Sequence, residues 1–163
     1  MASLTLSLRT EHPGWKKALK SPKALLTSAA KAALQAGACD LSGKVEIAFL
    51  LTDDAEIVAL NKMWRRKAKP TNVLSFPALP EASPPGGPVF LGDVAMALET
   101  VLAEAEAQNK NVEAHVAHLA VHGVLHLLGH DHLSADEAKP MERMEQDVMK
   151  SLGYPDPYRE VKR

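Results

Sequence analysis

The pattern of apolar and polar positions predicts alternating strands and helices in the first half of the chain. Leu4, Leu6 and Leu8 alternate with polar residues, which is the period of a half-buried strand. Ser21 and Pro22 resemble a helix cap followed by a proline at the first helical position. The predicted elements are a strand over Leu4–Leu8, a helix over Pro22–Gln35, a strand over Val45–Thr52, a helix over Asp53–Lys67 and a short strand over Val73–Phe76.

The second half of the chain begins with a loop and one more strand and ends in helices. Pro77–Pro88 contains five prolines and two glycines, which fit neither a sheet nor a helix. A strand follows over Val89–Ala97, with Gly92 as a bulge or a point of close approach. Three helices are predicted over Leu98–Gln108, Val112–Leu128 and Ser134–Leu152. Together these elements predict one α+β domain over residues 1–163, with a mixed sheet of about four strands and most helices on one face.

Length and composition agree with a single domain. The chain has 163 residues, of which 46% are hydrophobic. Met1–Arg9 lacks the features of a secretory signal, and Cys39 has no second cysteine with which to form a disulfide or a CxxC site. The most apolar stretch, Val116–Gly129, contains three histidines and falls short of the roughly 20 residues that span a bilayer. We therefore expect a soluble, cytoplasmic protein with no membrane partner.

The histidines are strongly clustered, since six of the seven lie between His115 and His132. In a helix, His122 and His126 lie one turn apart on the same face and can direct ring nitrogens at one ion. Gly129 can end the helix in a left-handed conformation, which lets His132 approach from the other side. Three imidazoles suit one Zn²⁺ ion and leave its fourth position open, as in catalytic sites. Other divalent transition metals remain alternatives for the same ligands.

Each of the other clustered histidines, and Asp131 beside them, has its own predicted role or alternatives. His118 would lie about 12 Å along the helix axis from His126, too far to share an ion with it, so it contacts a ligand or substrate or is simply a polar packing residue. His115 is expected on the surface. His130 and Asp131 are candidates for orienting a metal ligand, although Asp131 is equally typical of a turn.

The histidine spacing matches the metzincin protease pattern H-E-x-x-H-x-x-G-x-x-H except at one position. Gly123 replaces the glutamate that acts as general base in those proteases. This difference weakens a peptidase interpretation. Hydrolysis stays possible because zinc lowers the pKa of bound water to about 7. Asp93 is one candidate for the missing carboxylate.

A second unusual segment is strongly basic. Between Lys62 and Lys69 five of eight positions are lysine or arginine and none is acidic, and the arginines suit phosphate oxygens. The alternative is a helix end whose cations complement the helix dipole. Asn72 and Ser75 follow on an extended stretch and would be suited to lining a groove.

Charge and aromatic content bear on an RNA partner in opposite ways. The net charge of −1 hides a basic segment over residues 1–80, at +6, and an acidic one over residues 81–149, at −9. The basic segment could follow a phosphate backbone. Aromatic residues make up only 4% and are scattered, which makes a base-stacking platform hard to build.

Three motifs together resemble the YbeY family of bacterial metal-dependent endoribonucleases. They are Asn61–Pro77, Leu91-Gly92-Asp93 and His122–His132. The resemblance implies a zincin-like fold, a metal ion on His122, His126 and His132, and a functional arginine at Arg65.

The same resemblance implies a biological setting. It implies a single-strand-specific activity in 3′-end maturation of 16S ribosomal RNA and in ribosome quality control. Implied partners are ribosomal RNA, the small ribosomal subunit with a protein of its platform, and an Era-type GTPase. Two positions differ from the usual family pattern, since His130 stands where tyrosine is frequent and Asn72 where aspartate is frequent. A zincin-like peptidase and a non-enzymatic ribosome-assembly factor with a stabilising zinc remain alternatives, and the oligomeric state stays open.

Overall fold

The sheet in the computed structural model has four strands and is mixed, as predicted. The structure describes residues 2–37, 43–65, 70–130 and 135–158. The strands are β1 (Ala2–Thr10), β2 (Gly43–Thr52), β3 (Val73–Pro77) and β4 (Val89–Ala97). Their order is β1-β2-β4-β3, with β1, β2 and β4 parallel and β3 antiparallel to β4. The α+β class predicted from the sequence is therefore confirmed, and β3 is an edge strand.

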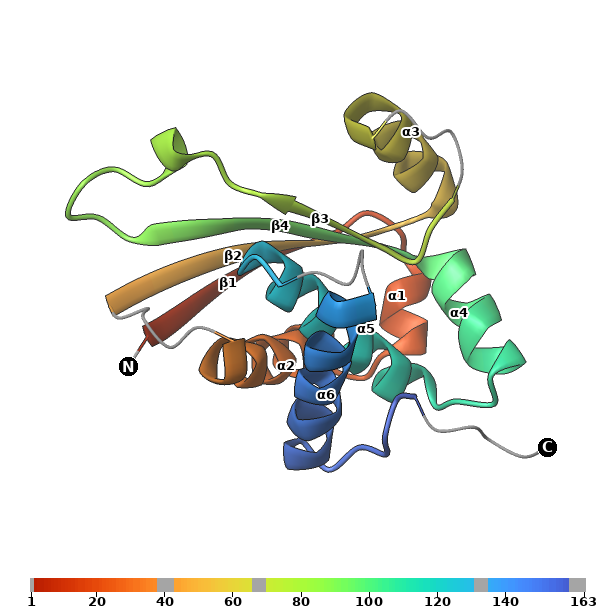
Figure 1. Ribbon diagram of the computed structural model, residues 1–163. Coiled ribbons are helices and arrows are strands. Elements are labelled where there is room, and N and C mark those ends of the chain that lie inside the picture. The colour runs from red at the N-terminus through yellow and green to blue at the C-terminus, as the bar shows by residue number, and fades with distance from the viewer. Residues whose placement is uncertain (1, 38–42, 66–69, 131–134, 159–163) are drawn as a thin grey trace.

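The helices lie mainly beneath one face of this sheet. They are α1 (Gly14–Ala18), α2 (Pro22–Gly37), α3 (Asp54–Arg65), α4 (Leu98–Ala107), α5 (Val112–Leu127) and α6 (Ala135–Ser151). Figure 1 shows α3 above the sheet and the other labelled helices below it. The main core fills the lower side, whereas a small cluster around Ile57 and Leu74 joins α3 to the upper side.

Helix α5 is the central element of the main core. It packs against α2, α4 and α6 and against strands β3 and β4. Asn111 caps its first turn, because the side-chain Oδ1 accepts the backbone N–H of Glu113 at 2.8 Å. At the other end Gly129 has φ +94°, and the N–H of His130 donates to the carbonyl of Leu125 at 3.0 Å. The predicted helix stop at Gly129 is confirmed.

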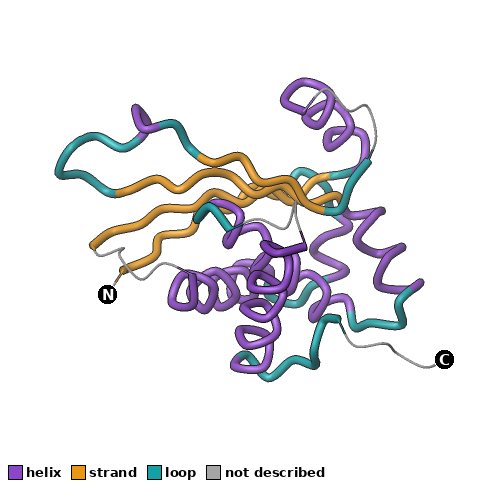
Figure 2. Tube along the Cα trace, in the orientation of Figure 1, coloured by secondary structure: helices purple, strands orange, loops and turns teal. Residues whose placement is uncertain are grey.

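The hairpin of β3 and β4 contains the predicted irregularity. Gly92 has φ +140°, and the register between β2 and β4 shifts beside it. A Cβ at Gly92 would lie 2.2 Å from the carbonyl oxygen of Phe76, so no other residue fits without movement. The proline-rich segment is a loop that contains one short 3₁₀ turn, Pro80–Ala82. Figures 1 and 2 show it extending past the helices at the end of the sheet.

Several boundaries differ from the predictions. Helix α1 is not predicted by the sequence pattern; Trp15 anchors it, fully buried, with its indole N–H donating to the carbonyl of Thr52 at 2.8 Å. Strand β1 is longer than Leu4–Leu8, because it pairs with β2 along its whole length. Helix α3 is described up to Arg65, and the remaining residues of its predicted range lie outside the described part.

None of the described helices is long and apolar enough to cross a membrane.

Candidate metal centre on the histidine helix

Helix α5 brings His122 and His126 together. Their Nε2 atoms lie 3.0 Å apart and their ring planes are inclined by 73°. The two Nε2 atoms therefore face each other, and because both side chains are half-buried they can be reached from solvent. His132 lies outside the described residues, and within the described ones no group of three potential ligands is assembled.

A buried carboxylate from α6 holds His122 in place. The Nδ1–H of His122 donates to Oε1 of Glu145 at 2.8 Å, and Glu145 is only 1% exposed. The same oxygen accepts the Nε2–H of His118 at 2.9 Å, and the other oxygen accepts the hydroxyl of Tyr158 at 2.6 Å. Since a carboxylate only accepts hydrogen bonds, the proton of neutral His122 sits on Nδ1 and leaves Nε2 as an acceptor.

The three donors keep Glu145 ionised. Burial alone would raise its pKa, but hydrogen bonds from His118, His122 and Tyr158 outweigh burial and hold the pKa at about 2. Burial, followed by the bond to Glu145, raises the pKa of Tyr158. The carboxylate is therefore charged at neutral pH and the phenol is neutral.

These residues fit a divalent metal. Imidazole nitrogens are common zinc ligands, and a ligating histidine usually donates its other N–H to a carboxylate or a carbonyl. His122 has this arrangement, with its Nε2 beside that of His126 and its Nδ1 on Glu145.

The other clustered histidines that the structure describes bind groups of the fold, and one of them departs from its predicted place. His115 is buried, not on the surface, and its Nε2 lies 3.0 Å from Oε1 of Glu104. Its apolar neighbours on α5 face the core, and the carboxylate binds one of the two nitrogens of the buried ring, while Nδ1 has no hydrogen-bond partner among the described residues. His118 contacts Glu145, one of the roles considered for it. His130 donates to the carbonyl oxygen of Gly37, so this contact ties the end of α5 to α2. Asp131 lies outside the described residues.

The protease glutamate has no place in this structure. A Cβ at Gly123 would lie 2.8 Å from Cγ1 of Val94 and 3.1 Å from Oγ of Ser75, so this position of α5 is pressed against the sheet. Asp93 does not substitute for it. Asp93 is the register partner of Phe76, which packs with the cluster beneath α3, and so lies on the sheet face away from α5.

The segment after α3 is used partly for structure. Arg65 is the last residue of α3, and its side chain lies outside the described part, as do residues 66–69. The amide of Asn72 donates to Glu104 at 3.0 Å, and the hydroxyl of Ser75 donates to the carbonyl of Gly123 at 3.0 Å. Both polar groups therefore join elements of the fold, and their lining of a groove stays a prediction.

Comparison with known proteins decides the family. The family model described as endoribonuclease YbeY matches residues 14–153. The chain belongs to the YbeY endoribonuclease family. Endoribonuclease YbeY of Paramagnetospirillum magneticum is 47% identical over 152 residues, covering 91% of this chain and 92% of that protein. Endoribonuclease YbeY of Azorhizobium caulinodans is 46% identical over 157 residues, covering 95% and 96%.

A solved structure supports the fold of this YbeY-family chain. The solution structure of TM1509 from Thermotoga maritima superposes with a TM-score of 0.54 at 24% identity, covering 95% of this chain and 99% of that one. At this identity the likeness concerns the fold alone.

Sequence reasoning missed Glu145 and Tyr158 in this YbeY-family site. One signal was present, because Glu145 shares a helical stripe with Met141, Val148 and Met149, which are all buried. An acid at a core position of an amphipathic helix indicates a buried partner. Nothing comparable marks Tyr158, which lies beyond α6 and beyond the residues that the YbeY family model matches.

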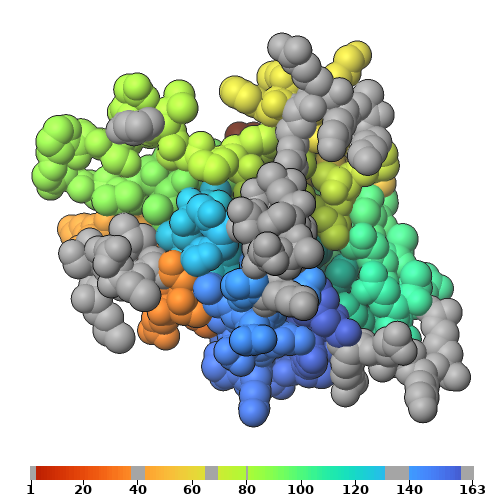
Figure 3. Space-filling view, viewed as in Figure 1, coloured from red at the N-terminus to blue at the C-terminus, as the bar shows by residue number. Residues whose placement is uncertain are grey.

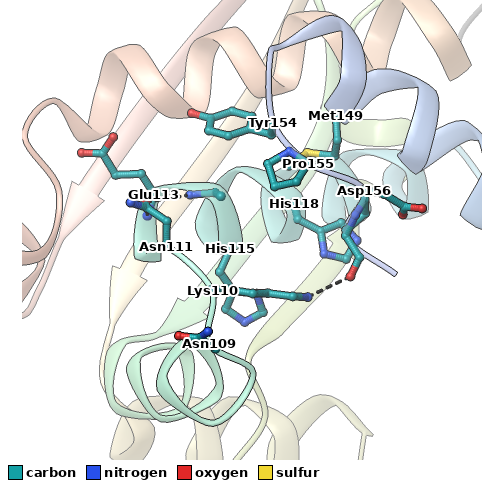
Figure 4. Close-up of a pocket in the computed structure, with 12 residues that line it drawn as sticks. Asn109, Lys110, Asn111, Glu113, His115, His118, Met149, Tyr154, Pro155 and Asp156 are labelled. Carbon is teal, nitrogen blue, oxygen red and sulfur yellow. Dashed lines mark hydrogen bonds between the residues drawn. The ribbon is translucent and has the colours of Figure 1, made fainter. Parts of the chain in front are cut away.

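His118, which donates to Glu145, also lines a cavity of about 440 Å³. Figure 4 shows that residues at the start of α5 and the chain after α6 enclose it, among them His115, Tyr154 and Asp156. Lys110 closes one side by donating to the carbonyl of Pro157 at 2.8 Å. His122 and His126 do not line this cavity, so it is separate from the candidate metal centre.

Proposed function

We propose that this protein is a metal-dependent endoribonuclease that hydrolyses phosphodiester bonds in single-stranded RNA. His122, His126 and His132 hold one divalent ion, with Zn²⁺ as the first choice, and Arg65 stabilises the negative charge that develops on the phosphate. Membership of the YbeY family supports the activity. Spacing and the motif resemblance support the roles of His132 and Arg65.

One observation carries the metal proposal: His122 and His126 converge while buried Glu145 binds the far side of His122. When bound, the ion supplies Lewis-acid polarisation of a phosphate oxygen and an acidified water. Glu145 accepts the Nδ1–H of His122 and fixes the orientation of its ring, while Tyr158 and His118 keep Glu145 in place. These residues therefore prepare the site before the substrate arrives.

The proposed setting is 3′-end maturation of 16S ribosomal RNA and ribosome quality control in the cytoplasm. The proposed partners are the small ribosomal subunit and an Era-type GTPase. The motifs shared with the YbeY family support this setting.

The test combines metal analysis with an RNA cleavage assay on metal-loaded and metal-stripped protein. We expect about one ion per chain, cleavage of single-stranded RNA that stripping abolishes, and loss of cleavage in both His122→Ala and Arg65→Glu. Matched controls are His12→Ala, which lies outside the cluster, and Arg9→Glu, on an exposed position of β1. Cleavage that persists at the wild-type rate in both site variants would contradict the proposal.

The same preparation tests the two competing functions. Chelator-sensitive cleavage of peptides without any cleavage of RNA would indicate a peptidase, which the packing around Gly123 disfavours. RNA binding that survives stripping, with a much lower melting temperature and no cleavage in any state, would indicate an assembly factor with a structural ion.

A further inference from the structure

Two aromatic side chains from separate elements meet on the upper face of the sheet. The rings of Trp64, near the end of α3, and Phe76, on β3, have centroids 6.1 Å apart and planes inclined by 55°. Trp64 is 66% exposed, while Phe76 is partly buried against the cluster beneath α3. In Figure 3 the side chains of α3, in yellow, stand at the upper surface beside the yellow-green of β3. The tilted contact supports the indole from one side and leaves most of it open to solvent.

This aromatic pair is joined to the candidate metal centre through neighbouring residues, although the two are far apart in the sequence. Phe76 follows Ser75, and Gly123 follows His122, and the hydrogen bond from Ser75 to Gly123 joins the two elements at 3.0 Å. The pair and the histidine helix lie on opposite faces of the edge strand β3. A single nucleic-acid strand that crosses this edge can therefore contact both.

We propose that Trp64, supported by Phe76, is a base-stacking platform for single-stranded RNA. The inference rests on the proposed endoribonuclease function and deepens it, since it names how the substrate strand is held. Exposed aromatic faces bind unpaired bases, and the bases of a duplex are already stacked on each other. The platform therefore selects single strands and positions the chain that crosses β3.

Stacking is the main contribution expected from this surface. Lys62, exposed one turn before the end of α3, can contact a phosphate. Asp93 is the register partner of Phe76 and adds a carboxylate to the same face. The discriminating measurement must therefore respond to the base and not only to the backbone.

The tryptophans provide such a measurement. The chain has two, and Trp15 is fully buried, so a change in tryptophan emission caused by a stacked base reports Trp64. The metal-loaded protein is mixed with a short oligouridylate in a stopped-flow instrument, and emission is recorded before cleavage accumulates. An oligonucleotide of the same length with abasic residues and a duplex RNA serve as comparison ligands.

We expect the oligouridylate to quench the emission and the abasic and duplex ligands to leave it unchanged. Trp64→Ala should raise the Kd for oligouridylate about tenfold and leave that for the abasic ligand unchanged. Trp64→Phe keeps an aromatic face, so it should bind within about threefold of wild type without the emission change. Met63→Ala is the matched control, because Met63 is adjacent, 71% exposed and not aromatic.

Three results would overturn the inference. The first is an unchanged Kd for oligouridylate in Trp64→Ala. The second is an equal rise of the Kd for the abasic ligand in that variant, and the third is an equal rise of the Kd for oligouridylate in Met63→Ala. An unchanged Kd combined with weaker binding to small ribosomal subunits would assign the pair to a protein contact instead. If wild type cleaves RNA while Trp64→Ala binds and cleaves identically, only this inference fails; if wild type does not cleave RNA, the proposed function itself fails.

Discussion

Replacing Glu145 by glutamine removes the charge behind His122 and keeps the shape of the side chain. Glutamine can still accept from His118 and His122 through its carbonyl oxygen, and its amide can donate to the hydroxyl oxygen of Tyr158. The lowering of the Glu145 pKa from 4.5 to about 2 corresponds to about 3 kcal/mol in favour of the ionised native state. Because neutral hydrogen bonds replace part of this, we expect Glu145→Gln to lose about 1–3 kcal/mol of unfolding free energy at neutral pH.

The sign of the pH dependence follows from the lowered pKa. A carboxylate with a depressed pKa stabilises the native state fully above the ordinary value of 4.5 and loses that contribution as the pH falls toward 2. The difference between wild type and Glu145→Gln in metal-free protein should therefore be largest near neutral pH and shrink in acid. Urea denaturation at several pH values measures it.

The same substitution should weaken metal binding, because a neutral partner makes His122 a poorer ligand. We expect the Kd for Zn²⁺, measured by competition with a chelator, to rise about 10- to 100-fold. Glu104→Gln is the matched control, since Glu104 also binds a histidine of α5, His115, at 3.0 Å, and His115 lies about two helical turns before His122. An unchanged Kd in Glu145→Gln, or an equal change in Glu104→Gln, would refute the reasoning.

Three further substitutions test other parts of the structure. Gly92→Ala should cost about 2 kcal/mol or more in urea denaturation, because its Cβ meets the carbonyl oxygen of Phe76 at a positive φ, whereas Gly86→Ala, with open space around it, should cost less. Gly123→Glu should unfold the protein without creating peptidase activity; circular dichroism and a peptide cleavage assay check both, and a folded, peptide-cleaving variant would contradict the packing argument. Burial lowers the pKa of His115, so the unfolded chain binds its proton first and stability falls as the pH drops below 6.5. His115→Gln should reduce that slope, by at most about 1.4 kcal/mol per pH unit, and an unaltered slope would count against the assignment.

The sequence predicted the features that depend on a few neighbouring residues. The alternating period of the first strand and the apolar, strand-forming runs of the other three predicted the four strands, and the proline content predicted the loop after β3. Gly129 predicted the end of α5, because left-handed backbone favours glycine over every other residue. The helical repeat alone placed His122 and His126 on one face.

The sequence did not predict the surroundings of side chains whose partners come from distant elements. Burial of His115 depends on Glu104 from another helix, and the polar groups of Asn72 and Ser75 are used by neighbours far along the chain. Asp93 belongs to the Leu91-Gly92-Asp93 motif, yet the pleat of β4 turns it to the face opposite α5.

What the sequence by itself determined, then, is the set of local conformations and the candidate ligands, because backbone sterics and helical periodicity act over a few residues. Only the tertiary structure decided what surrounds those ligands. Packing α6 against α5 supplies the buried Glu145 behind His122, and packing α3 over the edge strand turns scattered aromatics into the Trp64 and Phe76 pair. Such partners are chosen by burial and charge across the whole fold, which no short stretch of sequence records.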